Sequence, residues 1–252
     1  PRHGVRRQRQ MCIRDSAWRM KPLLRDLVLS ATYRQSARAT SVAAEQDPQN
    51  RLLSRGRRLR LTAEMVRDQA LASSGLLVDK MYGPSVMPPQ PEGVWRTVYS
   101  GAKWTTSAGE DRYRRAVYTY WRRTSAYPAM TTFDAPSRDV CVVRRIATNT
   151  PLQALVTLND PALVECAQAL ADKAVERVPD SLDQRIAWMY RQVTSAAPDD
   201  NVMTELLALF EHARHVAEQR SPATPESRKS GDAFALGIVA NTILNLDEAL
   251  TR

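Results

Sequence analysis

Polar side chains that could carry out chemistry gather in one stretch, from Phe133 to Pro161, with the sequence FDAPSRDVCVVRRIATNTPLQALVTLNDP. Carboxylates beside arginines could bind a sugar or an anion. They could also fasten a loop through ion pairs and Asx-type turns, and we favour this structural interpretation. The candidate binding or structural residues are Asp134, Arg138, Arg144, Arg145, Asn149, Gln153, Asn159 and Asp160.

The second half of the stretch also has the pattern of two helix starts. Thr150 can cap a first helix, with Pro151 at its first position and Gln153 reaching back to complete a capping box. Asn159 or Asp160 can cap a second helix, again with a proline at the first position. Helix ends therefore explain much of the polarity without a ligand.

Other candidate groups are isolated in the sequence. His212 and His215 stand at a spacing that can hold a metal with a third ligand, but no HExxH pattern accompanies them, and we interpret them as solvated. Cys141 and Cys166 could pair in an exported protein, although we favour a buried, inert Cys166 because it lies on an apolar helix face. The chain has no GxSxG, no Walker loop and no GxGxxG before a helix. The sequence therefore identifies no catalytic residue and no metal site, and it leaves open whether the protein is an enzyme.

Helical periodicity organises most of the chain. We predict a mainly α fold, an irregular multi-helix domain with long Pro-rich loops and little or no sheet. Residues 113–123 fit a helical face or a strand, and we favour a helix because the spacing continues over two turns. Residues 36–50 and 220–231 are polar and predict loops, and residues 83–93 form a Pro-rich connector. Further helices are predicted over residues 21–33, 62–77, 150–158, 160–178, 181–193, 202–213 and 236–244, with Thr62 and Ser181 as N-caps.

Length and charge set broad limits on the protein class. The chain of 252 residues is long enough for one large domain or two small ones. Its net charge is +9, and only five of its 36 basic residues are lysine. We attribute this bias to a GC-rich genome and expect no nucleic-acid partner, because no basic run is interleaved with aromatic residues. The longest apolar run, near residues 233–244, is too short and too interrupted to span a bilayer.

The first residues need an interpretation of their own. Met11–Ser16 reads MCIRDS, which the bases ATG TGT ATA AGA GAC AG encode, and this string resembles the transposon end used in sequencing libraries. We interpret residues 1–16 as an assembly scar and residues 17–252 as one helical domain of a larger protein, with a possible sub-boundary near 179–181. Without the scar the chain has 31 basic and 26 acidic residues, a net charge of +5.

The stretch from Phe133 to Pro161 resembles one family closely. Further matching blocks are KPLLRDLVLSATYRQS, DPQNRLLSRGRRLRLTAEMVRDQAL, PPQPEGVW, DRYRRAVYTYWRRTS and LNLDEALTR, which follow in family order from about Trp18 to Arg252. Together they resemble the planctomycete-specific C-terminal domain of unknown function (domain of unknown function 1553) that closes large cytochrome-c-associated proteins.

The resemblance implies a setting that the residues themselves do not show. Such proteins are thought to be exported, to the periplasm or beyond, often alongside sulfatases and other enzymes of polysaccharide degradation. Haem c is implied for the missing N-terminal part and not for this fragment, which has no CxxCH motif. The implied partners are the upstream domains of the same polypeptide and possible polysaccharide. The family has no established catalytic residues, so only the eight polar positions named above carry over.

Two functions follow as hypotheses. In the first, the domain is a non-catalytic scaffold, in which Arg144 and Arg145 pair with Asp134, Asp139 or Asp160 and the polar groups are mostly buried and mutually satisfied. This is the hypothesis that we favour.

In the second hypothesis, the domain is part of an extracellular enzyme that processes polysaccharide or a sulfated sugar and is coupled to haem. Asp134, Arg138 and the TNTP groups would then line an open cleft beside aromatic platforms. A third hypothesis is an anion-binding surface built from arginine. The candidate platforms are Trp95, Trp104, Tyr118 and Trp121.

Overall fold

The computed structural model describes residues 14–15, 17–37, 40–95, 103–220 and 225–251. Regular secondary structure over these residues is helical, and strand-like pairing is limited to three isolated bridges. The mainly α prediction is therefore confirmed. None of the helices in the described ranges is long and apolar enough to cross a membrane. The chain divides into two compact units, one up to Leu59 and one from Arg60 to Thr251.

The first unit contains two helices, α2 (Met20–Leu29) and α3 (Ser41–Gln46). Helix α3 lies within residues 36–50, which were predicted as a loop, and this prediction is wrong for the helical residues. The cause is local capping, because the hydroxyl of Thr40 accepts a hydrogen bond from the backbone N–H of Ala43 at 3.2 Å. Helix α2 agrees with the predicted helix over 21–33 but ends four residues earlier and buries none of its side chains.

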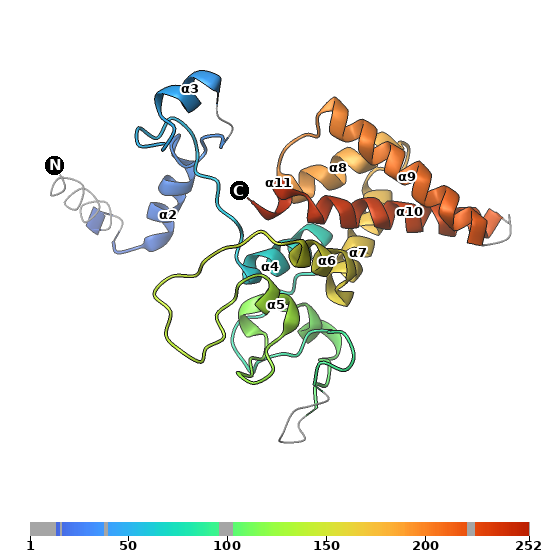
Figure 1. Ribbon diagram of the computed structural model, residues 1–252, viewed down its shortest axis with the longest axis horizontal. Coiled ribbons are helices and arrows are strands. Elements are labelled where there is room, and N and C mark those ends of the chain that lie inside the picture. The colour runs from blue at the N-terminus through green and yellow to red at the C-terminus, as the bar shows by residue number, and fades with distance from the viewer. Residues whose placement is uncertain (1–13, 16, 38–39, 96–102, 221–224, 252) are drawn as a thin grey trace. The chain divides into compact units, whose positions relative to one another are not determined.

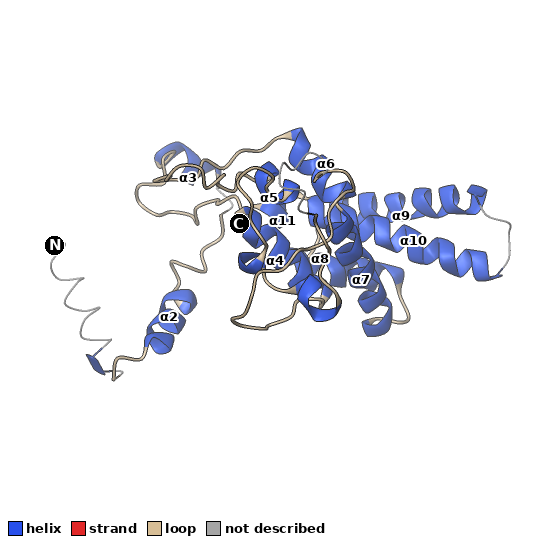
Figure 2. Ribbon diagram, turned by 90° about the horizontal axis from the view of Figure 1, so that it is seen from below, coloured by secondary structure: helices blue, strands red, loops and turns tan. Residues whose placement is uncertain are grey.

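The second unit is built around one hydrophobic core formed mainly by five helices (Figures 1 and 2). Core residues come from both sides of 179–181, where a sub-boundary was predicted, including Leu170 before it and Ile186 after it, each fully buried. Helices α9 and α10 run side by side in both views. The five helices are α4 (Ala63–Ser74), α7 (Pro161–Arg177), α8 (Leu182–Thr194), α9 (Asp200–Arg220) and α10 (Pro225–Asn245).

Helix α10 begins earlier than the sequence predicted. Residues 220–231 were expected to form a linker, but the helix starts at Pro225, and residues 221–224 lie outside the described part. A helix can begin in a polar segment, and proline is favoured at a first helical position. Polarity alone was therefore a poor indicator of a loop.

A second, smaller cluster lies beside the main core. It joins α4 to the short helices α5 (Pro128–Thr132) and α11 (Asp247–Leu250), and it includes the fully buried ring of Tyr127. The backbone N–H of Leu61 donates to the carbonyl of Leu250 at 2.9 Å. The start and the end of the second unit are thus held together by backbone pairing.

The predicted helix over 113–123 is wrong. A 3₁₀ turn, η1 (Gly109–Tyr113), ends at its first residue, a second, η2 (Ala116–Tyr118), lies within its first half, and extended chain follows. The backbone of Val86 donates to the carbonyl of Tyr118 at 2.8 Å and accepts from the N–H of Tyr120 at 2.7 Å. Partners from the Pro-rich connector therefore replace the internal hydrogen bonds of a helix, in keeping with the β-branched and aromatic composition of this segment.

Arg114 fastens the connector to this segment. Its guanidinium donates to the carbonyls of Lys80, Tyr82 and Pro84, and it lies 3.8 Å from the ring centroid of Tyr118. The residue is only 1% exposed and forms no ion pair with a described residue. The buried charge is instead solvated by carbonyl dipoles and by an aromatic face.

Candidate functional site

The polar stretch folds so that three of its side chains converge. Asp134, at φ 60°, accepts hydrogen bonds from the backbone N–H of Thr148 at 2.7 Å and from its hydroxyl at 2.8 Å. The side-chain amide of Gln153 donates to the same carboxylate at 3.3 Å, to Oγ1 of Thr148 at 3.2 Å and to the carbonyl of Thr132 at 3.1 Å. These contacts close the long loop between α5 and α6 (Pro151–Asn159) at its base.

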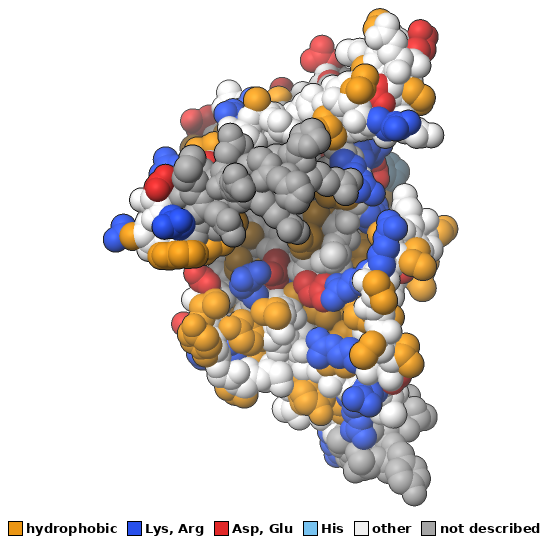
Figure 3. Space-filling model, turned by 90° about the vertical axis from the view of Figure 1, so that its left-hand side faces the viewer, with side chains coloured by type: hydrophobic (Ala, Val, Ile, Leu, Met, Phe, Trp, Pro, Cys, Tyr) orange, Lys and Arg blue, Asp and Glu red, His pale blue; other side chains and the backbone are white. Residues whose placement is uncertain are grey.

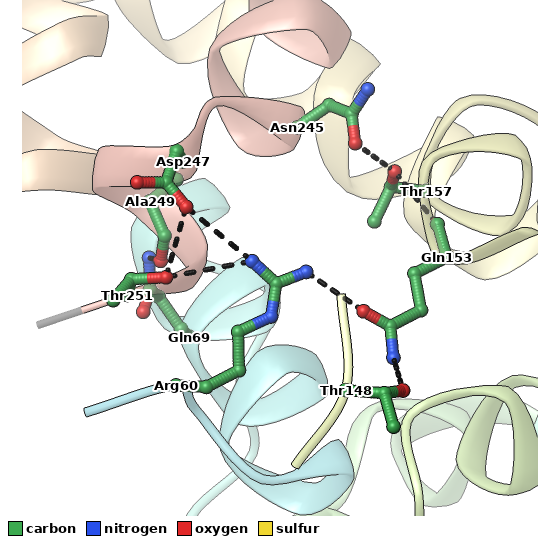
Figure 4. Close-up of polar contacts among 9 residues, drawn as sticks. All are labelled: Arg60, Gln69, Thr148, Gln153, Thr157, Asn245, Asp247, Ala249 and Thr251. Atoms are coloured by element: carbon green, nitrogen blue, oxygen red, sulfur yellow. Dashed lines mark hydrogen bonds and ion pairs between the residues drawn. The ribbon is translucent and has the colours of Figure 1, made fainter. Parts of the chain in front are cut away.

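The other side of the Gln153 amide faces Arg60 (Figure 4). Nη2 of Arg60 donates to Oε1 of Gln153 at 2.8 Å, while Nη1 lies 3.4 Å from Oγ1 of Thr251 and 3.6 Å from the carboxylate of Asp247. Gln153 is 1% exposed, so its amide is fully used inside the protein. The network extends from the loop base to the C-terminal turn of the unit.

The same face of α6 continues this network (Figure 4). Thr157, one turn after Gln153, donates its hydroxyl to Oδ1 of Asn245 at the end of α10. Beside it, the Gln69 amide donates to the carbonyl of Ala249 at 2.9 Å. Polar side chains thus join α4, α6 and the two C-terminal helices.

The capping prediction for this stretch is half correct. Asp160 caps α7, accepting from the N–H of Ala162 at 2.9 Å, and Pro161 stands at the first helical position as predicted. Thr150 is the N-cap residue of α6, but its side chain makes no cap hydrogen bond. The predicted capping box there is wrong, because Gln153 is drawn inward by Arg60 and by the loop base. Asn159 is exposed and donates to the carbonyl of Leu155 within its own helix.

Asp160 is the buried carboxylate of the stretch, 6% exposed. Burial raises its pKa above the ordinary value of 3.8, and hydrogen bonds from the N–H groups of Ala162 and Leu163 oppose this rise in part. It borders a cavity of about 20 Å³ together with Arg67 and Tyr127, whose pKa is also raised by burial. This volume is room for about one water molecule and for no sugar.

The arginines of the stretch do not pair as the scaffold hypothesis expected. Arg145 forms an ion pair with Glu64 on α4 at 2.7 Å instead of with an aspartate of the stretch. Arg138, at φ 64°, stacks on Trp121 at 5.1 Å. Arg144 and Asn149 are exposed, and the side chain of neither forms a hydrogen bond or an ion pair with a described residue. The expectation of mostly buried polar groups therefore holds for Gln153 and Asp160 and is wrong for the arginines.

The candidate sugar platforms each have one face or edge occupied. Arg114 lies over Tyr118, and Arg122 lies 5.4 Å from the centroid of Trp95. Trp104 stacks on Tyr127 with ring centroids 5.8 Å apart. Arg138 covers Trp121. Arginine and tyrosine therefore already supply the stacking partners that a sugar would need.

Three of the indole and phenol polar atoms here also form hydrogen bonds, whereas the buried Nε1 of Trp95 forms none with a described residue. Nε1 of Trp104 donates to the carbonyl of Pro88 at 2.8 Å, and the hydroxyl of Tyr127 donates to the carbonyl of Pro89 at the same distance. Nε1 of Trp121 donates to the carbonyl of Ser137 at 3.1 Å. The aromatic residues therefore anchor the Pro-rich connector and the base of the α5–α6 loop.

The histidine and cysteine interpretations agree with the structure. His212 and His215 are exposed on α9, and the described residues contain no group of three metal-ligating side chains. Cys166 is 1% exposed, and burial raises the pKa of its thiol to about 11. Cys141 is exposed and both thiols are free, so the two residues are not paired.

Sequence reasoning missed the residues that complete the polar network. Arg60, Asp247 and Thr251 belong to none of the predicted clusters, and Arg60 lies 191 residues from Thr251 along the chain. Glu64, the partner of Arg145, belongs to none of them either. Nothing in the local pattern around these residues could have identified their partners, because the pairing is set by the packing of α4, α6 and α11.

Comparison with known proteins gives a family and no function. A protein-family model described as "Protein of unknown function (DUF1553)" matches residues 10–210. No curated protein and no solved structure matches the chain.

Proposed function

Because the chain belongs to the DUF1553 family of proteins of unknown function, we propose that it is the C-terminal helical module of a large exported, cytochrome-c-associated protein. In this proposal it is a scaffold or docking domain with no catalytic site of its own. Its partners are the upstream domains of the same polypeptide, and its location is periplasmic or extracellular. Family resemblance is the support for export and for the haem partner.

The observation that supports a scaffold is that the polar side chains of the stretch which face inward have their partners within the protein. Asp134, Gln153 and Asp160 are all engaged by backbone groups or by other side chains, and the Gln153 amide alone has four hydrogen-bond partners. A binding site would leave some of these donors and acceptors for its ligand. In a scaffold they pair within the protein, because unpaired buried groups cost free energy. The cavity beside Asp160 is too small to change this assessment.

The haem partner cannot be held by this chain in the usual covalent way. Attachment of haem c needs a CxxCH motif, and the sequence has none. Of the two described cysteines, Cys166 is buried and Cys141 is exposed. In our proposal the haem therefore belongs to the upstream part, and this domain acts on it only by positioning that part.

The alternative is a share in an extracellular enzyme acting on polysaccharide or sulfated sugar. It would require the exposed arginines and the aromatic rings to form a cleft with unpaired polar groups. The stacking of Arg138 on Trp121 and of Arg114 on Tyr118 weighs against free platforms.

The experiment uses the full-length, haem-loaded protein from a cleanly assembled gene, screened against neutral and sulfated polysaccharides. Reducing-end release and the haem absorption spectrum are followed together in wild type, Asp134→Ala, Arg138→Ala and the exposed-site control Asn149→Ala. We expect turnover, where wild type shows any, to be unchanged in Arg138→Ala, which keeps the buried network. Loss of turnover or of haem reduction in a folded Arg138→Ala protein would support the enzyme alternative.

Docking is measured on the same full-length protein by chemical cross-linking and mass spectrometry. We expect cross-links between residues 60–251 and the upstream domains. A full-length protein in which this unit forms no such cross-links, and unfolds independently of the upstream domains in calorimetry, would contradict the docking proposal.

A further inference from the structure

One arginine buried in the second unit has a polar atom without a protein partner. Figure 3 shows lysine and arginine side chains at the surface of the protein, where water hydrates their charge. Arg67, on α4, is instead 7% exposed, and its Nη2 donates to the carbonyl of Arg112 at 2.7 Å. Its Nε is buried and forms no hydrogen bond with any described residue. Buried N–H groups are nearly always satisfied by the protein or by an ordered water, because an unpaired one is destabilising.

The cavity beside Asp160 lies next to this arginine. Its volume is about 20 Å³, and both Arg67 and Asp160 line it. A water molecule needs a cavity of about 10–15 Å³. The rest of the lining is apolar or aromatic and comes from α4, from the region of α5 and from the first turn of α7. A water molecule in this cavity therefore finds its polar partners in Arg67 and Asp160.

Asp160 has the capacity to accept a hydrogen bond from such a water. Its Oδ1 accepts from the N–H of Ala162 at 2.9 Å, and an ionised carboxylate has about four acceptor sites. Burial raises the pKa of Asp160, and the charge of Arg67 is one of the influences that oppose this rise. The two charges are therefore close enough to interact.

Arg67 and Asp160 nevertheless make no direct hydrogen bond or ion pair with each other. Two opposite charges that interact across a water-sized space are well suited to a bridging water. Together they are neutral, so the site favours neither a cation nor an anion over water.

Other buried arginines show why the cavity matters. Nε of Arg60, Arg112 and Arg114 is also buried and has no partner in the described part of the chain. None of these three residues lines the cavity beside Asp160, whereas Arg67 does. Arg67 therefore combines an unpaired donor with adjacent space for an acceptor.

We propose that this cavity is a binding site for one ordered water molecule, which accepts a hydrogen bond from Nε of Arg67 and donates one to the carboxylate of Asp160. The water joins α4 to the start of α7 and completes the hydrogen bonding of the buried guanidinium. The inference concerns the interior of the second unit and does not depend on the proposed docking function.

The first test is a high-resolution crystal structure of the whole chain. We expect density for one water molecule at about 2.7–3.2 Å from Nε of Arg67 and from a carboxylate oxygen of Asp160. A cavity without density overturns the proposal, as does a water bonded to only one of the two residues. A direct contact between the guanidinium and the carboxylate overturns it too, and so does an anomalous signal from bromide at this position.

The second test detects the water in solution by NMR of the isotope-labelled whole chain. The Hε proton of Arg67 should show a nuclear Overhauser effect to a long-lived bound water. Arg185 is the matched control, because its Nε donates directly to the carbonyl of Val178 at 2.7 Å and should show no such effect. Absence of the effect at Arg67 in the wild-type chain overturns the proposal without any variant.

A cavity-filling variant removes the water and leaves both charged residues in place. Ala63 is 4% exposed and lines the cavity, so the two methyl groups added by Ala63→Val occupy the volume of the water. We expect the effect at Arg67 to be lost in this variant. Ala72→Val adds the same atoms at an exposed position of the same helix and should keep the effect. A folded Ala63→Val protein that retains the effect would place the water elsewhere and overturn the proposal.

Discussion

The guanidinium of Arg60 donates to the side-chain amide oxygen of Gln153 at 2.8 Å, across 93 residues of sequence. This contact links the base of the α5–α6 loop to the C-terminal residues Asp247 and Thr251. The most buried amide of the stretch is thus the centre of a structural network. Substitutions in this network should change the stability of the fold before they change any chemical activity.

Gln153→Ala should lower the free energy of unfolding by about 2–3 kcal/mol, because it leaves Arg60 and the carbonyl of Thr132 without their buried partner. Urea denaturation followed by circular dichroism measures this loss. The control is Asn159→Ala on the exposed side of the same helix, which should stay within about 0.5 kcal/mol of wild type. Equal losses in the two variants would contradict a special role for Gln153.

Asp160→Asn should change the pH dependence of stability. Because burial raises the pKa of Asp160 above its ordinary 3.8, the folded state binds a proton more readily than the unfolded state. The stability from this proton is complete below pH 3.8 and is lost as pH rises through the raised pKa. Asparagine still caps α7, so the variant should lack this loss and gain stability relative to wild type as pH rises.

Thermal unfolding across this pH window checks the prediction, with Asp160→Ala as the control that removes the cap. Asp160→Ala should be less stable than Asp160→Asn by about 1 kcal/mol. A pH profile of Asp160→Asn that runs parallel to wild type would show that the Asp160 carboxylate is not the titrating group.

Arg145→Ala should raise the pKa of Glu64. Burial raises this pKa, but the hydrogen bond from Arg145 and a backbone hydrogen bond outweigh burial, so it lies below the ordinary 4.5. Carboxyl NMR titration measures the change, with Arg144→Ala as the neighbouring control. The ion pair stabilises the fold above pH 4.5, and this contribution is lost as pH falls through the lowered pKa. Its loss should cost about 0.2–1 kcal/mol, because both groups are partly exposed.

Arg114→Lys should destabilise the protein by about 2–4 kcal/mol and release the Pro-rich connector. A single ammonium cannot reach the carbonyls of Lys80, Tyr82 and Pro84 together or stack on Tyr118 as a planar group. Hydrogen exchange at the amide of Val86 should speed up. Arg115→Lys, at a half-exposed ion pair with Asp68, is the control and should leave exchange at Val86 unchanged.

The helix starts of this fold were predictable because their causes are local. Thr62 accepts from the N–H of Met65, Ser181 from that of Gln184 and Asp160 from that of Ala162, all as the cap patterns indicate. Pro151 and Pro161, at the first positions of α6 and α7, also indicated where these helices begin.

The remaining parts depended on contacts that no local pattern contains. The segment after Tyr113 has helical spacing, yet pairing with Val86 made it extended. Gln153 fits a capping box, yet its amide oxygen accepts a hydrogen bond from Arg60, which is far away in the sequence. Of the eight candidate residues, Asp134 and Gln153 come together, while Arg138 and Arg145 contact partners outside the stretch, and this division follows from burial and packing that no local pattern contains.

The backbone bond between Leu61 and Leu250 has a consequence for how a newly made chain matures. Ribosomes add roughly 5–20 residues per second, so the 191 positions between Arg60 and Thr251 take about 10–40 s to synthesise. Throughout that interval Val66 and Ala63 lack the side chain of Leu250, with which they share a core. The unit therefore cannot close through this bond until Leu250 has been synthesised.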